Sequence, residues 1–257
     1  FFIAFMCWIT ASLFGALPYL ILGVFETPFG AIFESVSGYT TTGATVLSDI
    51  ESQPRGILFY RSFTQWLGGM GIIVLAIAVL PKLSVGGMQL MSMETPGPHA
   101  EKLTPHVQHT AKHLWLIYLG LSAALTALLF VSGMPLYESI TTTFSTVSTG
   151  GFSVRDASIG AYGSPLIESI VIVFMILGGT NFLLLYFFFT GSFTRPFKST
   201  EFKFYLLLLL IFIVVVSIDL RVYVFGEFSE AFRLSAFQVV AIMTGTGFTT
   251  ANFAEWT

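Results

Sequence analysis

Long apolar stretches alternate with shorter polar segments along the whole of this chain. Five of these stretches contain the roughly 20 mainly apolar residues that a helix needs to cross the hydrocarbon core of a membrane. They are Phe1–Phe25, Gly56–Leu80, Lys112–Gly133, Ile167–Phe193 and Phe202–Phe225. The pattern therefore predicts a protein built from membrane-spanning helices.

Two of the stretches carry charged residues close to one end. Arg61 lies near the start of the second stretch, and Asp219 and Arg221 lie near the end of the fifth. Long side chains in such positions can extend toward the lipid headgroups. We therefore expect these charges to lie at the membrane surface.

A short pattern occurs three times between the long stretches, at Thr41–Thr45, Thr149–Ser153 and Gly245–Thr249. In each copy a glycine is followed two residues later by a hydroxyl residue, and a helical stretch of about ten residues precedes it. Ten residues are too few to cross a membrane, so each short helix must enter and return on one side. The pattern is typical of re-entrant pore loops.

The three glycines divide the chain into similar units. They lie 108 and 96 residues apart, which predicts a helix, a short pore helix, a loop and a second helix (M1–pore helix–M2) in each unit. We expect units at 1–111, 112–201 and 202–257, the last truncated after its loop. Because four loops surround the ion in a potassium-channel filter, we expect an all-α membrane protein with a pseudo-fourfold axis, and a fragment of it here.

The loops are the candidate ion site. Glycine adopts positive φ at no steric cost, which lets successive carbonyl groups face one axis and replace the water around a cation. The pore helices also point their negative C-terminal ends toward this place. The predicted ligands of a K⁺ ion, with no structural metal, are Thr42, Gly43, Ala44, Gly150, Gly151, Phe152, Thr246, Gly247 and Phe248.

Composition agrees with a membrane location and excludes several other functions. Apolar residues make up 54% of the 257 residues and charged residues 10%, and the mean hydropathy is +0.83. With a net charge of −3, no basic patch and no phosphate-binding glycine motif, no nucleic-acid partner and no cofactor are expected. The five lysines fall opposite the predicted loops, which places them on the cytoplasmic side by the positive-inside rule.

Other polar or small residues allow more than one interpretation. Gly178, Gly179 and Asn181 interrupt the fourth stretch, where they predict either a kink or part of an inner vestibule. The glycines of 68–71 are interpreted as helix-packing residues. For any single glycine loop, packing between helices is also an alternative to ion binding.

The histidines do not support an enzyme. His106, His109 and His113 have helical spacing, but no cysteine or nearby carboxylate completes a metal site, so a solvated helix face is the favoured interpretation. The only cysteine, Cys7, lies in an apolar run, and no nucleophile with a base is present in the spans. We therefore expect a transport protein and no catalytic residues.

Four further segments resemble the Trk/Ktr/HKT superfamily of potassium transporters, most nearly its bacterial TrkH-type membrane subunits. They are Ser62–Val74, Gly86–Leu90, Pro96–Pro98 and Thr110–Tyr118, and the resemblance extends over essentially the whole chain. It implies potassium uptake across the cytoplasmic membrane, a homodimer and a cytoplasmic nucleotide-binding regulatory subunit of the TrkA type. A Na⁺/K⁺ symporter, another monovalent-cation transporter or a carrier for another solute are the alternatives, and both channel-like and coupled transport stay open.

Overall fold

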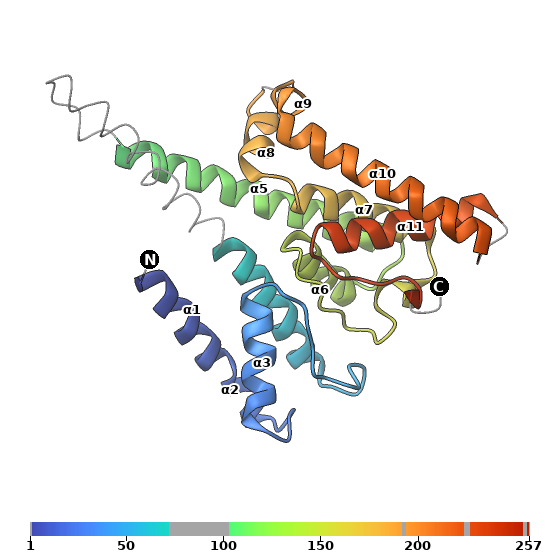
Figure 1. Cartoon of the computed structure of the whole chain (residues 1–257). Helices are drawn as coiled ribbons and strands as arrows, with labels where there is room; N and C mark the ends of the chain where they lie inside the picture. The colour runs from blue at the N-terminus through green and yellow to red at the C-terminus, as the bar shows by residue number, and fades with distance from the viewer. Residues whose placement is uncertain (1, 72–102, 192–193, 224–226, 254–255, 257) are drawn as a thin grey trace, which may run out of the picture.

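The computed structural model describes residues 2–71, 103–191, 194–223, 227–253 and 256, and every regular element within them is helical (Figure 1). The elements, in chain order, are α1 (Phe2–Gly15), α2 (Leu17–Ile21), α3 (Pro28–Tyr39), an unlabelled helix at 55–71, α5 (Leu103–Val131), α6 (Leu136–Val147), the 3-10 helix η1 (Ser158–Tyr162), α7 (Pro165–Gly178), α8 (Phe182–Phe189), α9 (Arg195–Lys198), α10 (Thr200–Tyr223) and α11 (Phe228–Met243).

Two of the predicted spans are confirmed as single helices. Within the described residues, Lys112–Val131 of α5 and Thr200–Val222 of α10 are long and apolar enough to cross a membrane. The first stretch forms a shorter apolar helix over Phe5–Ile21. The second is helical from residue 55 to residue 71, and the rest of it lies outside the described residues.

The fourth stretch bends at the place where Gly178, Gly179 and Asn181 predict a kink. The stretch Ile167–Phe193 forms α7 and α8, which meet at an angle of 103°. The helix stops because the Asn181 side chain accepts a hydrogen bond from the N–H of Leu183 at 3.0 Å and so begins a new helix. A Cβ on Gly179 would lie 3.0 Å from the side chain of Thr244 at the end of α11, so the bend packs against α11.

The three short helices before the loops are confirmed. The first, α3, begins at Pro28 behind Thr27, whose hydroxyl accepts a hydrogen bond from the N–H of Gly30. Both α3 and α6 have 12 residues, close to the expected length, whereas α11 has 16. The long helix α10 packs side by side with α11 (Figure 1).

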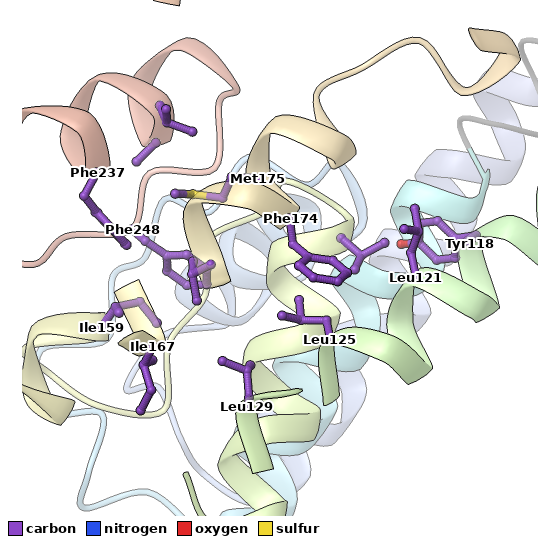
Figure 2. Close-up of a cluster of buried hydrophobic side chains, with 14 of the residues drawn as sticks. Tyr118, Leu121, Leu125, Leu129, Ile159, Ile167, Phe174, Met175, Phe237 and Phe248 are labelled. Carbon is purple, nitrogen blue, oxygen red and sulfur yellow. The ribbon is translucent and has the colours of Figure 1, made fainter. Parts of the chain in front are cut away.

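The main hydrophobic core lies between α5, α7, α11 and the loops, as Figure 2 shows. Three or four residues separate successive inward side chains of α5, so they share one face of the helix. These side chains, all less than 10% exposed, are Tyr118, Leu121, Leu125 and Leu129. They meet Phe174 and Met175 of α7, while Phe237 of α11 and Phe248 of the third loop complete the same cluster.

The expectation that Arg61 extends to the membrane surface is wrong. Its side chain is 1% exposed and lies inside the protein, where its Nε donates to the carboxylate of Glu34 at 2.5 Å. Glu34 on α3 is itself fully buried and accepts further hydrogen bonds from Thr45 and from the N–H of Val46. A buried charge of either sign is tolerated only with such a partner, which explains why the two lie together.

The core predicts a strong effect of one leucine. Leu125→Ala removes most of a fully buried side chain and should lower the free energy of unfolding by about 2 to 5 kcal/mol through the cavity it leaves. Leu116→Ala on the same helix is the matched control, because Leu116 is 55% exposed. Unfolding of the full-length protein in mixed detergent micelles measures both, and equal losses would contradict this packing.

The buried ion pair predicts a second contrast. Glu34→Gln leaves the Arg61 charge without its counter-ion and should cost about 3 to 5 kcal/mol of stability. Glu51→Gln is the control, because Glu51 is 46% exposed and pairs with the half-exposed Arg155, an arrangement worth at most about 1 kcal/mol. The same unfolding measurement applies, and a Glu34→Gln variant as stable as the control would overturn the assignment.

Candidate functional site

The three glycine loops share one backbone conformation. In each, the two residues with positive φ are separated by one residue. The prediction that Gly43, Gly151 and Gly247 adopt positive φ is confirmed, at 76°, 77° and 74°. The preceding positions with positive φ are Thr41 (55°), Thr149 (53°) and Gly245 (77°). The three loops therefore repeat in backbone conformation as well as in sequence.

Each loop is tied back to the helix that precedes it. The N–H of Thr42 donates to Ser37 O at 2.9 Å, and the N–H of Gly150 donates to Ser145 O at 2.8 Å, as in a Schellman cap. The third loop uses the N–H of Gly247 and the carbonyl of Ala241, at 3.0 Å. The last turns of the pore helices thus hold the loops in place.

These bonds also set the direction of the carbonyl groups. In a trans peptide the N–H and the C=O point in opposite directions. The N–H bonds to the pore helices therefore turn the carbonyls of Thr41, Thr149 and Thr246 away from those helices. Of these three, sequence reasoning named only Thr246 as a carbonyl ligand, because it took the residue before the glycine in every copy.

Neighbouring loops touch backbone to backbone. A Cβ atom on Gly43 would lie 1.9 Å from the carbonyl oxygen of Gly150, and one on Gly151 would lie 1.7 Å from that of Thr246. Both distances are far below any allowed contact, so only glycine fits at these two positions. The structure thus brings together Gly43, Gly150, Gly151 and Thr246, four of the predicted site residues. Among the described residues, apart from its chain neighbours, none has an atom within 4 Å of a Cβ placed on Gly247.

The residues that follow the glycines have different surroundings. The side chains of Phe152 and Phe248 are buried, each 1% exposed, whereas Ala44 is exposed. The guanidinium of Arg61 lies 3.9 Å from the ring centre of Phe152, and its Nη1 donates to Ser153 O at 3.0 Å. The two aromatic side chains therefore anchor the second and third loops in the protein.

Gln65 is a residue of the site that sequence reasoning missed. Its Nε2 donates to Gly150 O at 2.7 Å, and its Oε1 accepts from the N–H of Phe152 at 3.0 Å. The residue is fully buried in the helix at 55–71. The available signal was an amide within an apolar stretch, which has to face protein or water and not lipid.

A polar cluster joins the segments that follow the first and second loops. Arg155 donates to Glu138 at 2.7 Å and to Glu51 at 3.2 Å, and Tyr162 donates to Glu138 at 2.6 Å. Burial, together with this hydrogen bond, raises the pKa of Tyr162 well above its usual value. Arg155, Glu138 and Glu51 also line a pocket of about 130 Å³. The cluster fastens the two segments to each other beside the loops.

The other predicted positions lie around the loops. A Cβ on Gly178 would lie 3.2 Å from the side chain of Thr149, so the bend after α7 lies beside the second loop. Asn181 is exposed and caps α8, and a role of this bend in a vestibule stays a prediction. Close packing is confirmed for Gly68, where a Cβ would lie 2.1 Å from Tyr39 O, and for Gly69, where one would lie 2.7 Å from the hydroxyl of Tyr118.

The histidines give no metal site within the described part of the chain, where no group of three candidate ligands occurs. His113 packs edge-on against Tyr186, with ring centres 5.6 Å apart. The side chains of His106 and His109 lie outside the described residues.

Comparison with known proteins gives the family. The family model for TrkH cation transport proteins matches residues 1–257. The chain is 42% identical over 265 residues to the Trk system potassium uptake protein TrkH of Vibrio parahaemolyticus, 41% identical to that of Escherichia coli, and 39% identical to the protein TrkG of Escherichia coli. It covers 53% to 54% of each relative and is itself covered completely, so it spans about half their length.

A solved structure gives the same result. The crystal structure of the potassium transporter TrkH from Vibrio parahaemolyticus matches with a TM-score of 0.87 at 38% identity, covering 98% of this chain and 52% of that one. The all-helical architecture with pore-loop repeats is therefore that of a membrane transporter. Together with the family model over its whole length, this shows that the chain belongs to the TrkH family of cation transport proteins.

Proposed function

We propose that this chain supplies three loops of the ion-selective filter of a protein that takes up K⁺ across the cytoplasmic membrane. The observation that carries the proposal is the common backbone geometry of the loops, with alternating positive φ and direct contact between neighbouring loops. The named relatives are potassium uptake proteins, which supports K⁺ as the ion. No cofactor and no catalytic step enter the proposal.

Backbone oxygen carries the selectivity in this proposal. The loop segments Thr41–Thr45, Thr149–Ser153 and Gly245–Thr249 contain no charged side chain. A dehydrated cation is then met by carbonyl groups that replace its water shell and still let it leave. The C-terminal ends of α3, α6 and α11 lie directly before the loops and add a favourable negative potential for a cation.

The assembly that we propose around the filter is inferred from the family to which the chain belongs. We propose a multi-pass protein of the inner membrane that functions as a homodimer with a cytoplasmic, nucleotide-binding regulatory subunit. Its relatives are described as parts of a Trk system, which supports a protein of several components. The predicted units 1–111, 112–201 and 202–257 each contribute one loop to this pore.

The filter proposal predicts a change of ion preference in Gly151→Ser. The serine Cβ would overlap Thr246 O, so the second and third loops have to separate. We expect the K⁺/Na⁺ preference of the full-length protein to fall by about tenfold, which corresponds to about 1.4 kcal/mol of ion-binding free energy. The measurement is K⁺ and Na⁺ uptake at low external K⁺ in cells that lack their own K⁺ uptake systems.

Gly163→Ser is the matched control for this experiment. Gly163 also has positive φ, at 54°, but a Cβ there would meet no other described residue within 4 Å apart from its chain neighbours. The control therefore shares the backbone strain and not the contact between loops. A full-length parent protein that is present in the membrane but restores no K⁺ uptake would refute the proposed function, and equal preferences in the two variants would refute the filter.

A further inference from the structure

We propose that Gln65 is a positioning residue for the second loop, and that its side-chain amide replaces a contact between hydroxyl groups that holds the first and third loops. The inference rests on the proposed function, because its consequence is for ion preference. Gln65 lies in the helix at 55–71 and precedes the second loop by more than 80 residues in the sequence.

Two of the loops contain the same pair of hydroxyl groups. In the first loop the side chains of Thr40 and Thr42 are hydrogen-bonded at 2.8 Å, and in the third loop Thr244 and Thr246 are hydrogen-bonded at 2.8 Å. These residues occupy equivalent places, three residues and one residue before the glycine of positive φ. The pair links the end of the pore helix to the loop in both units.

The second loop lacks this pair and has Gln65 in its place. Its equivalent positions are Ser148, whose hydroxyl donates to Phe144 O within α6, and Gly150, which has no side chain. Gln65 Nε2 donates to Gly150 O, and Gln65 Oε1 accepts from the N–H of Phe152. One amide thus holds the backbone on both sides of Gly151.

The amide and a side chain at position 150 exclude each other. A Cβ on Gly150 would lie 2.4 Å from Cδ of Gln65, so the threonine found in the other two loops does not fit beside this glutamine. The glycine at 150 is therefore explained by the space that Gln65 occupies. Its φ is not positive, and the glycine is not required there by backbone conformation.

The position of Gln65 gives it influence over two loops. The oxygen that it binds, Gly150 O, is the atom that lies against Gly43 of the first loop. Because the site is buried, removal of the amide would leave the N–H of Phe152 without this partner, and the loop would move to satisfy it. A shift of this carbonyl changes the spacing between the loops, and with it the fit of the ion.

Gln65→Met tests the proposal, because it preserves an unbranched side chain of similar length and removes both hydrogen bonds. We expect uptake of K⁺ to persist in the full-length protein and its K⁺/Na⁺ preference to fall by about tenfold. The control is Thr64→Val, an adjacent and equally buried residue whose hydroxyl donates within its own helix, to Arg61 O. The control should leave the preference unchanged.

Gly150→Ala disturbs the same contact from the side of the loop, because its methyl group displaces the amide of Gln65. It should lower the preference in the same direction, and it carries the test if Gln65→Met does not reach the membrane. In the double variant the two losses should not add, since both act on one pair of hydrogen bonds. The preferential thermal stabilisation of the purified protein by K⁺ over Na⁺ provides a readout independent of uptake.

The outcomes separate the two proposals. If the parent restores K⁺ uptake and both Gln65→Met and Gly150→Ala retain its preference, the role of Gln65 is refuted and the proposed function stands. An equal loss in Thr64→Val would also refute it, because the loss would then reflect general loosening of the helix. If the parent does not transport K⁺, the proposed function falls and this inference falls with it.

Discussion

An irregular peptide segment inside a membrane has to satisfy its backbone N–H and C=O groups within the protein, because lipid offers no partner. The second loop shows how this requirement organises the structure. The N–H of Gly150 bonds to the preceding pore helix, and the N–H of Phe152 bonds to Gln65 from a different helix. These N–H bonds turn the carbonyl of Thr149 away from the pore helix, while Gly150 O accepts from Gln65.

The same requirement applies to charge. Arg61 and Glu34 are both buried and pair with each other, and each also bonds to a different loop: Glu34 to Thr45 of the first, Arg61 to Ser153 O of the second. The ion pair therefore bridges two loops, which a pair of apolar side chains would not do with any directional preference. It fixes the relative position of segments more than 100 residues apart without placing a charge in either loop.

Sequence reasoning predicted the helices, the three loops and the positive φ of their glycines, because the length of an apolar stretch and the conformation of a glycine are local properties. It failed where a distant partner decides the outcome. Arg61 near the start of an apolar stretch has the pattern of a side chain that extends to the headgroups, and only the fold reveals Glu34 beside it. The role of Gln65 likewise depends on a loop from another unit. The bend at Asn181 was predictable, because paired glycines and an amide interrupt an apolar run.

The glutamine contact at the second loop has a consequence for the symmetry of the proposed pore. In a ring of four identical subunits, any residue that holds one loop is repeated around the axis, and all loops must be held in the same way. Fusion of the units into one polypeptide removes this restriction, so the contacts that hold each loop can diverge independently. Here the second loop is held by an amide where the first and third loops have threonine hydroxyl pairs, so the proposed pore is free to depart from fourfold symmetry.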